Sequence, residues 1–179
     1  MARKDKHMLL KVRKSRTGGC VSIPGSKSHT IRAVFIASLA EGKSVINRPL
    51  ISDDTMSAVE VCRAFGAKIE NFGDRFIIEG VNGSPKLPQN TINVGNSGTA
   101  LCFGLMTAGL VDGTTEITGD YQIQKRPLGP LIDAMNKLGA DVYSINGNNS
   151  APVVVKGRLS GGCTELDAVT SQYLSAILI

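Results

Sequence analysis

The sequence predicts an α/β fold with mixed sheets, in which a unit of strand–helix–strand–helix–strand–strand recurs along the chain. Three observations predict it. Short strand-like runs separate longer segments that have helical periodicity. The pair Gly66-Ala67, which ends a predicted helix, recurs as Gly139-Ala140 after 73 residues. The chain has 179 residues and a hydrophobic content of 42%, enough for a domain with a substantial core.

The first repeated unit is predicted at residues 24–90, and residues 1–23 before it are predicted to form N-terminal strands. Glycine, proline and polar clusters mark the ends of the elements. We expect N-terminal strands at 8–13 and 20–23, a helix at 28–40, a strand at 44–47, a helix capped at 52–54 that ends at 66–67, and strands at 68–71 and 75–79.

The second unit is predicted at residues 91–160 and a third at residues 161–179. In the second we expect a strand at 91–94, a helix at 100–111, a strand at 114–118, a helix that Arg126-Pro127 opens, and strands at 141–145 and 152–156. The third begins with a strand at 164–167, and its helix starts at 170–172. Because the sequence ends inside this apolar helix without a cap, we expect the chain to be part of a longer protein.

Composition disfavours several classes of function. The net charge is +5, but lysine and arginine are scattered, aromatic residues make up only 4% and tryptophan is absent, so a nucleic-acid-binding surface is not indicated. The four cysteines form no Cys-x-x-Cys pair and there are two histidines, so neither a metal site nor a disulfide framework is expected. The longest apolar run, residues 100–111, is too short to span a membrane. We therefore expect a cytoplasmic protein with reduced thiols.

Residues 24–32 carry the most informative motif. Pro-Gly-Ser-Lys-Ser at 24–28 ends a strand-like run and places Ser26 at a helix N-cap position. Lys27 and Arg32 follow in the first turns of the helix. A helix start offers unpaired N–H groups and a positive dipole end, so this segment is predicted to bind an anion, most plausibly phosphate.

Two further helix starts resemble the first, at residues 96–99 and 170–172. If the repeats stack about a common axis, the three starts face one cavity, which Arg126 can also reach. Each hydroxyl taken alone is an ordinary N-cap, and Asp53 and Asp54 are interpreted as caps. Cys102 is interpreted as a core residue, because it lies in an apolar helix.

Four motifs in this order resemble the EPSP synthase family: residues 24–28 with Arg32, 96–100, 125–129 and 171–176. The resemblance implies two domains, each with three βαβαββ units around a pseudo-threefold axis. Residues 24–179 would then be an incomplete N-terminal domain whose third unit is truncated. The first strand of residues 1–23 would belong to the far domain.

The resemblance also implies an activity: transfer of the enolpyruvyl group from phosphoenolpyruvate to the 5-hydroxyl of shikimate 3-phosphate, in the shikimate pathway of aromatic amino acid biosynthesis. It implies a monomer without cofactor or metal, whose catalytic acidic residues lie in the second domain, so that this chain alone is inactive. The residues implied for shikimate 3-phosphate are Lys27, Ser28, Arg32, Thr170, Ser171 and Gln172. Those implied for phosphoenolpyruvate are Lys27, Asn96, Gly98, Arg126 and Gln172.

Two positions depart from the family pattern. Thr170 stands where serine is usual and keeps the hydroxyl, whereas Cys102 stands where arginine is common. One alternative is a UDP-N-acetylglucosamine enolpyruvyl transferase, which Lys27-Ser28 disfavours because that family prefers Lys-Asn there. The other is a non-catalytic domain that binds anions or nucleic acid through its basic face.

Overall fold

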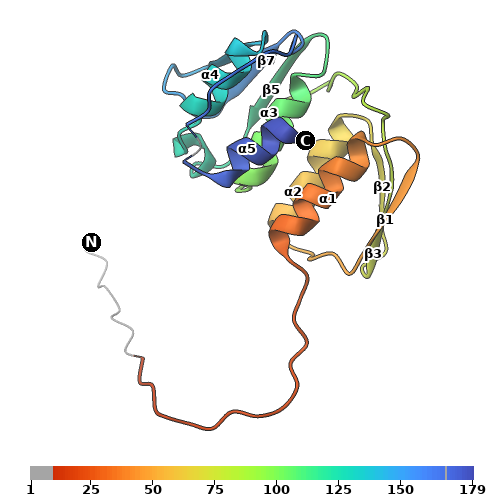
Figure 1. Cartoon of the computed structure of the whole chain (residues 1–179), viewed down its shortest axis with the longest axis vertical. Helices are drawn as coiled ribbons and strands as arrows, with labels where there is room; N and C mark the ends of the chain where they lie inside the picture. The colour runs from red at the N-terminus through yellow and green to blue at the C-terminus, as the bar shows by residue number, and fades with distance from the viewer. Residues whose placement is uncertain (1–9, 168) are drawn as a thin grey trace, which may run out of the picture.

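The computed structural model describes residues 10–167 and 169–179. Residues 10–25 run away from the folded body without helix or strand (Figure 1). The strand predicted at 20–23 therefore does not form, nor does the part of 8–13 that is described; residues 8 and 9 lie outside the described residues. Val12 and Val21 are 92% and 86% exposed, because no neighbouring strand pairs with this segment. Its assignment to a far domain stays a prediction.

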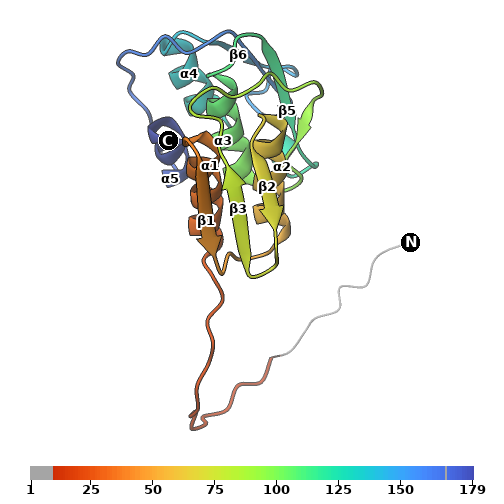
Figure 2. The ribbon, with the colours of Figure 1, turned by 90° about the vertical axis from the view of Figure 1, so that its right-hand side faces the viewer.

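The first sheet has three antiparallel strands in the order β1-β3-β2. They are β1 (Lys43–Asn47), β2 (Lys68–Asn71) and β3 (Arg75–Glu79). Helices α1 (Lys27–Leu39) and α2 (Asp53–Ala64) lie behind this sheet in Figure 2. The inward residues Phe76 and Ile78 are fully buried, as the alternation of the strand requires.

The second sheet has four strands in the order β4-β5-β7-β6, and β4 pairs with β5 in parallel. Its other pairs are antiparallel. The strands are β4 (Ile92–Asn93), β5 (Thr114–Thr118), β6 (Asp141–Ser144) and β7 (Val153–Lys156), and the helices of this unit are α3 (Gly98–Ala108) and α4 (Gly129–Lys137).

The two sheets confirm the repeated unit. The order β1-β3-β2 corresponds to the order β5-β7-β6 with every strand displaced along the chain, and α1 and α2 flank β1 in the sequence as α3 and α4 flank β5. The second unit is a complete βαβαββ motif. The first lacks a counterpart of β4 within the described residues, so the outer edge of β1 is unpaired there.

Two further predicted elements differ from the structure. The helix predicted to open at Arg126-Pro127 begins at Gly129, after a short 3₁₀ turn, η1 (Ile123–Lys125). Arg126 has an extended backbone (φ −76°, ψ 126°), because a residue before proline is disfavoured in the helical region. The strand predicted at 164–167 does not form, whereas α5 (Ser171–Leu178) starts at the predicted place.

The core is organised around α3, all eleven residues of which are buried. This helix lies between the two units in Figure 1, with α5 beside it. Phe103 of α3 meets Phe35 of α1 edge-to-face, with ring centroids 5.3 Å apart. Although α3 belongs to the second unit, it also packs against α1 and α2 of the first and against α5. Its N-terminus is therefore held where α1, α2 and α5 also begin. None of the helices in residues 10–167 and 169–179 is long and apolar enough to cross a membrane.

Candidate functional site

Four helices begin with a hydroxyl residue as N-cap. The Oγ atoms of Ser26, Ser52 and Ser97 accept hydrogen bonds from backbone amides three residues later, and Thr170 accepts one from the amide of Gln172. Each cap satisfies one first-turn amide and leaves others without an intrahelical acceptor. All four helix starts were predicted, but only those of α1, α3 and α5 were predicted to face a common cavity.

These helix starts meet at one cavity of about 370 Å³, which we call the first cavity. The prediction that α1, α3 and α5 face a common cavity is therefore confirmed, and α2 joins them. The residues that line it are Lys27, Asp53, Asp54, Asn96, Ser97, Gly98, Thr99, Gln122, Arg126 and Gln172.

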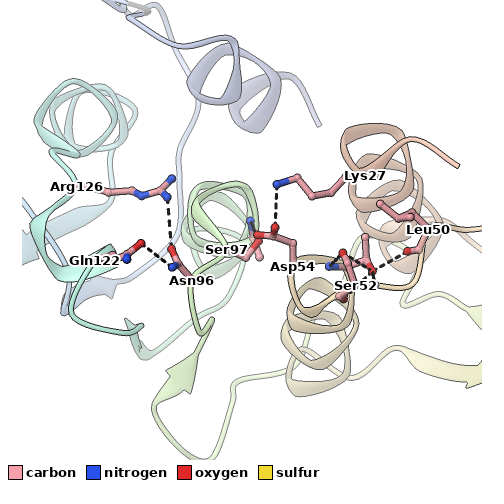
Figure 3. A network of polar contacts seen from close by, with 10 residues as sticks. Lys27, Leu50, Ser52, Asp54, Asn96, Ser97, Gln122 and Arg126 are labelled. Carbon is pink, nitrogen blue, oxygen red and sulfur yellow. Dashed lines mark hydrogen bonds and ion pairs between the residues drawn. The ribbon is translucent and has the colours of Figure 1, made fainter. Parts of the chain in front are cut away.

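Two cationic side chains reach toward each other across the start of α3. Figure 3 shows Lys27 from α1 and the Arg126 guanidinium from the opposite side. The Nζ atom of Lys27 lies 2.8 Å from Oδ2 of Asp54 in the first turn of α2, and the two side chains are 50% and 30% exposed. The cavity thus has a cation at each side and a positive helix end at its base, which attract an anion, while the carboxylates of Asp53 and Asp54 line it from α2.

The start of α3 is shaped to fit Arg126. A Cβ atom on Gly98 would lie 2.5 Å from the Nη1 atom of Arg126, so a side chain at this position would push the guanidinium away from the helix start. Nη2 of Arg126 donates to Oδ1 of Asn96 at 3.5 Å. The arginine fork therefore lies beside the helix start, with its remaining N–H groups available to a ligand.

We expect Gly98→Ala to weaken binding of a phosphate-bearing anion by about 3- to 30-fold, because the new methyl group displaces one charge-assisted donor of Arg126. The measurement is a titration with phosphoenolpyruvate in which NMR monitors binding. Gly42→Ala is the matched control for adding a methyl group, since that glycine has no atom within 4 Å of its Cβ position. An equal loss of affinity in Gly98→Ala and Gly42→Ala would contradict this account of Gly98.

Arg32 does not line the first cavity. Its guanidinium donates to the carbonyl oxygen of Ser28 at 3.2 Å and to Oγ of Ser175 at 2.9 Å. It also lies over the Phe103 ring, 5.5 Å from the centroid. Arg32 therefore joins α1 to α5 and α3, while the side chain of Ser28 is exposed on the first turn of α1.

A second cavity of about 270 Å³ adjoins the first and shares Gly98, Arg126 and Gln172 with it. Thr170 lines this second cavity, and Ser171 lines neither. All residues predicted for phosphoenolpyruvate line the first cavity. Of those predicted for shikimate 3-phosphate, Lys27 and Gln172 line the first, Thr170 and Gln172 line the second, and Ser28, Arg32 and Ser171 line neither. The ligand assignments themselves stay predictions.

Sequence reasoning missed three residues of the first cavity, Asp53, Asp54 and Gln122. Asp54 was interpreted as a helix cap, but Ser52 caps α2, and the Asp54 carboxylate pairs with Lys27. Gln122 was not singled out at all, although its side chain bonds to Asn96. The start of α2 carried a signal for Asp54, because Asp54 stands in the first turn of a helix that begins, like α1, α3 and α5, with a hydroxyl N-cap.

Cys102 lies under the site and is not positioned as a nucleophile. It is 2% exposed, and burial raises the pKa of its thiol to about 12, although Arg126 opposes that shift. The thiol is therefore protonated at neutral pH, which agrees with the interpretation of Cys102 as a core residue. In the described part of the chain, no group of three or more His, Cys, Asp or Glu residues is arranged to hold a metal ion.

The sequence matches the family described as EPSP synthase (3-phosphoshikimate 1-carboxyvinyltransferase) over residues 12–179. A 3-phosphoshikimate 1-carboxyvinyltransferase of Acetivibrio thermocellus is 66% identical over 172 residues, and one of Ruminiclostridium cellulolyticum is 58% identical. In both comparisons 96% of this chain aligns with 41% of the relative. The chain thus spans about two fifths of the length of these curated relatives.

Among solved structures, the fold is similar to that of an EPSP synthase from Acinetobacter baumannii, with a TM-score of 0.83 and 26% sequence identity. The match covers 89% of this chain and 37% of that chain.

Proposed function

Because the chain belongs to the EPSP synthase family, we propose that it supplies part of an enzyme that transfers the enolpyruvyl group of phosphoenolpyruvate to the 5-hydroxyl of shikimate 3-phosphate. This reaction belongs to the shikimate pathway and releases phosphate. One observation carries the proposal: Lys27, Arg126 and the start of α3 converge on a single cavity. An alternative UDP-N-acetylglucosamine substrate is not favoured by the matched family.

The chemistry requires two anions to be held side by side. The 5-hydroxyl loses its proton as its oxygen bonds to C2 of phosphoenolpyruvate, and C3 gains a proton. The tetrahedral intermediate then loses a C3 proton and phosphate, which restores the C2–C3 double bond. Arg126 and Lys27 are proposed to hold the carboxylate and phosphate of phosphoenolpyruvate, with the amides at Gly98 between them. Fixing C2 next to the hydroxyl lowers the entropic part of the barrier.

Shikimate 3-phosphate is proposed to lie toward α1 and α5. Lys27, on the first turn of α1, and Gln172, on the first turn of α5, would contact both substrates, since they border the first cavity from two helices. The other proposed contacts are Ser28, Arg32, Thr170 and Ser171. Arg32 would exchange its bond to Ser175 for one to the ligand.

The remaining proposals concern the whole protein. The matched relatives extend beyond the aligned segment, and we propose that acid–base groups and further cations come from that remainder, so that the 179 residues bind substrate but do not turn it over. We further propose a monomeric, cytoplasmic enzyme that uses neither metal nor cofactor.

The test is a chimera in which this chain replaces the aligned 41% of the Acetivibrio thermocellus relative. We expect the chimera to release phosphate only when both substrates are present, and the 179-residue chain alone to release none above background. UDP-N-acetylglucosamine in place of shikimate 3-phosphate is the control substrate. A chimera that folds and binds shikimate 3-phosphate, yet releases no phosphate, would refute the proposed function; turnover by the chain alone would refute the role given to the remainder.

A further inference from the structure

Gln122 lines the first cavity between Asn96 and the chain segment that carries Arg126. Its Oε1 atom accepts a hydrogen bond from Nδ2 of Asn96 at 2.8 Å (Figure 3). Its Nε2 atom donates to the hydroxyl of Tyr121 at 3.1 Å. The Gln122 amide therefore has partners for both its oxygen and its nitrogen, and the oxygen faces Asn96.

The bond from Asn96 to Gln122 determines which way the Asn96 amide points. Because its nitrogen is engaged by Gln122, its oxygen is turned toward Arg126 and accepts from Nη2 at 3.5 Å. If the amide turned over, an N–H group would face the guanidinium, and two donors would oppose each other. Tyr121, Gln122, Asn96 and Arg126 thus form one chain of hydrogen bonds that ends at the cavity.

The backbone holds Gln122 in place for this task. Oδ1 of Asp120 accepts from the amides of Gln122 and Ile123, both at 3.0 Å, and the Ile123 side chain is fully buried. The amide of Asp120 donates to the carbonyl of Gly95 at 2.8 Å. This bond ties the loop of Gln122 directly to the loop of Asn96, so the two side chains meet across a fixed backbone contact.

We propose that Gln122 is a positioning residue of the phosphoenolpyruvate site: it fixes the Asn96 amide, which in turn holds the Arg126 guanidinium toward the anion. The inference rests on the proposed function, because it concerns how that site is ordered. Gln122 acts through Asn96 and need not touch the ligand. Its loss should weaken phosphoenolpyruvate binding and spare shikimate 3-phosphate, whose proposed contacts lie on α1 and α5.

The test uses the full 179-residue chain and two-dimensional NMR with phosphoenolpyruvate, inorganic phosphate and shikimate 3-phosphate as probes. We expect Gln122→Met, which keeps the length but removes the acceptor, to raise the phosphoenolpyruvate dissociation constant by about 3- to 10-fold. The constant for shikimate 3-phosphate should stay within about twofold. Gln124→Met is the matched control, since Gln124 lies on the same 3₁₀ turn but bonds to Gly119 outside the cavity.

A second readout requires no ligand. The side-chain amide signal of Asn96 should shift in Gln122→Met and return in Gln122→Glu, because a carboxylate oxygen restores the acceptor. Glutamate also repels anions, so only its Asn96 signal is compared. An unchanged dissociation constant for phosphoenolpyruvate in Gln122→Met, or an unshifted Asn96 side-chain signal, would overturn the inference and leave the proposed function intact. A folded wild-type chain that binds neither substrate would overturn the proposed function and this inference with it.

Discussion

We expect Arg126→Ala in the chimera to weaken phosphoenolpyruvate binding by about 10- to 150-fold while shikimate 3-phosphate binding changes by less than about twofold. The lower and upper bounds correspond to the loss of one charge-assisted contact worth about 1.5–3 kcal/mol. The effect is selective because Arg126 reaches the cavity from the segment before α4, opposite to α1. Calorimetric titration with each substrate alone measures both constants.

Two variants sharpen this result. Arg126→Lys should recover only part of the affinity, since an ammonium group cannot reproduce the planar fork that lies over Gly98. Arg75→Ala is the matched control, because Arg75 is also a partly exposed arginine but stacks on Phe72 at the edge of the first sheet. If Arg126→Ala weakened the binding of both substrates equally, the assignment of Arg126 to phosphoenolpyruvate would be contradicted.

Lys27→Ala is expected to weaken both substrates, each by about 10-fold or more, because Lys27 stands between their proposed positions. Removing the Lys27 side chain has two effects on binding. A cation that attracts the ligands is removed, and the carboxylate of Asp54, which Lys27 neutralises at 2.8 Å, is left facing the anions. The double variant Lys27→Ala with Asp54→Asn should therefore bind both substrates more tightly than Lys27→Ala alone.

The same calorimetric titrations measure this coupling. Lys68→Ala is the control, since Lys68 makes an ion pair of 3.0 Å with Glu79 on the first sheet, away from the cavity. If Asp54→Asn brought no recovery in the Lys27→Ala background, the repulsion from Asp54 would be excluded. If Lys27→Ala weakened the binding of phosphoenolpyruvate alone, the proposal that Lys27 contacts both substrates would be wrong.

Sequence reasoning located the helix starts because their determinants are local. Ser26, Ser52, Ser97 and Thr170 each cap a helix through an amide two or three residues away, and such spacing is visible in the sequence. The strands predicted at 8–13 and 20–23 do not form within the described residues 10–13 and 20–23, for the opposite reason. Strand composition is local, but a strand forms only where a partner lies alongside.

The start of α4 shows a conflict between two local rules. Proline is favoured in the first turn of a helix, which suggested that Arg126-Pro127 opens the helix. Proline also disfavours the helical backbone conformation for the residue before it, and Arg126 is accordingly extended. The helix begins three residues later, with a second proline, Pro130, in its first turn. This extended backbone is what directs Arg126 to the cavity.

The candidate site was predicted where residue type and repeat position sufficed, as for Lys27, Asn96 and Arg126. Asp54 and Gln122 were missed because their roles depend on packing. Asp54 meets Lys27 only because α2 lies beside α1, and Gln122 meets Asn96 only because the loops at Gly95 and Asp120 are bonded. No periodicity in the sequence reports either contact.

The unpaired edge of β1 gives the two sheets unequal local stability. In the described chain β1 is bonded to β3 alone, whereas its counterpart β5 is bonded on both sides, to β4 and β7. Opening β1 therefore breaks one ladder and opening β5 breaks two, so β1 has the lower free energy of local unfolding. Val45, at the middle of β1, is already 56% exposed. The first sheet would then fray from its edge inward while the second still holds the start of α3 in place.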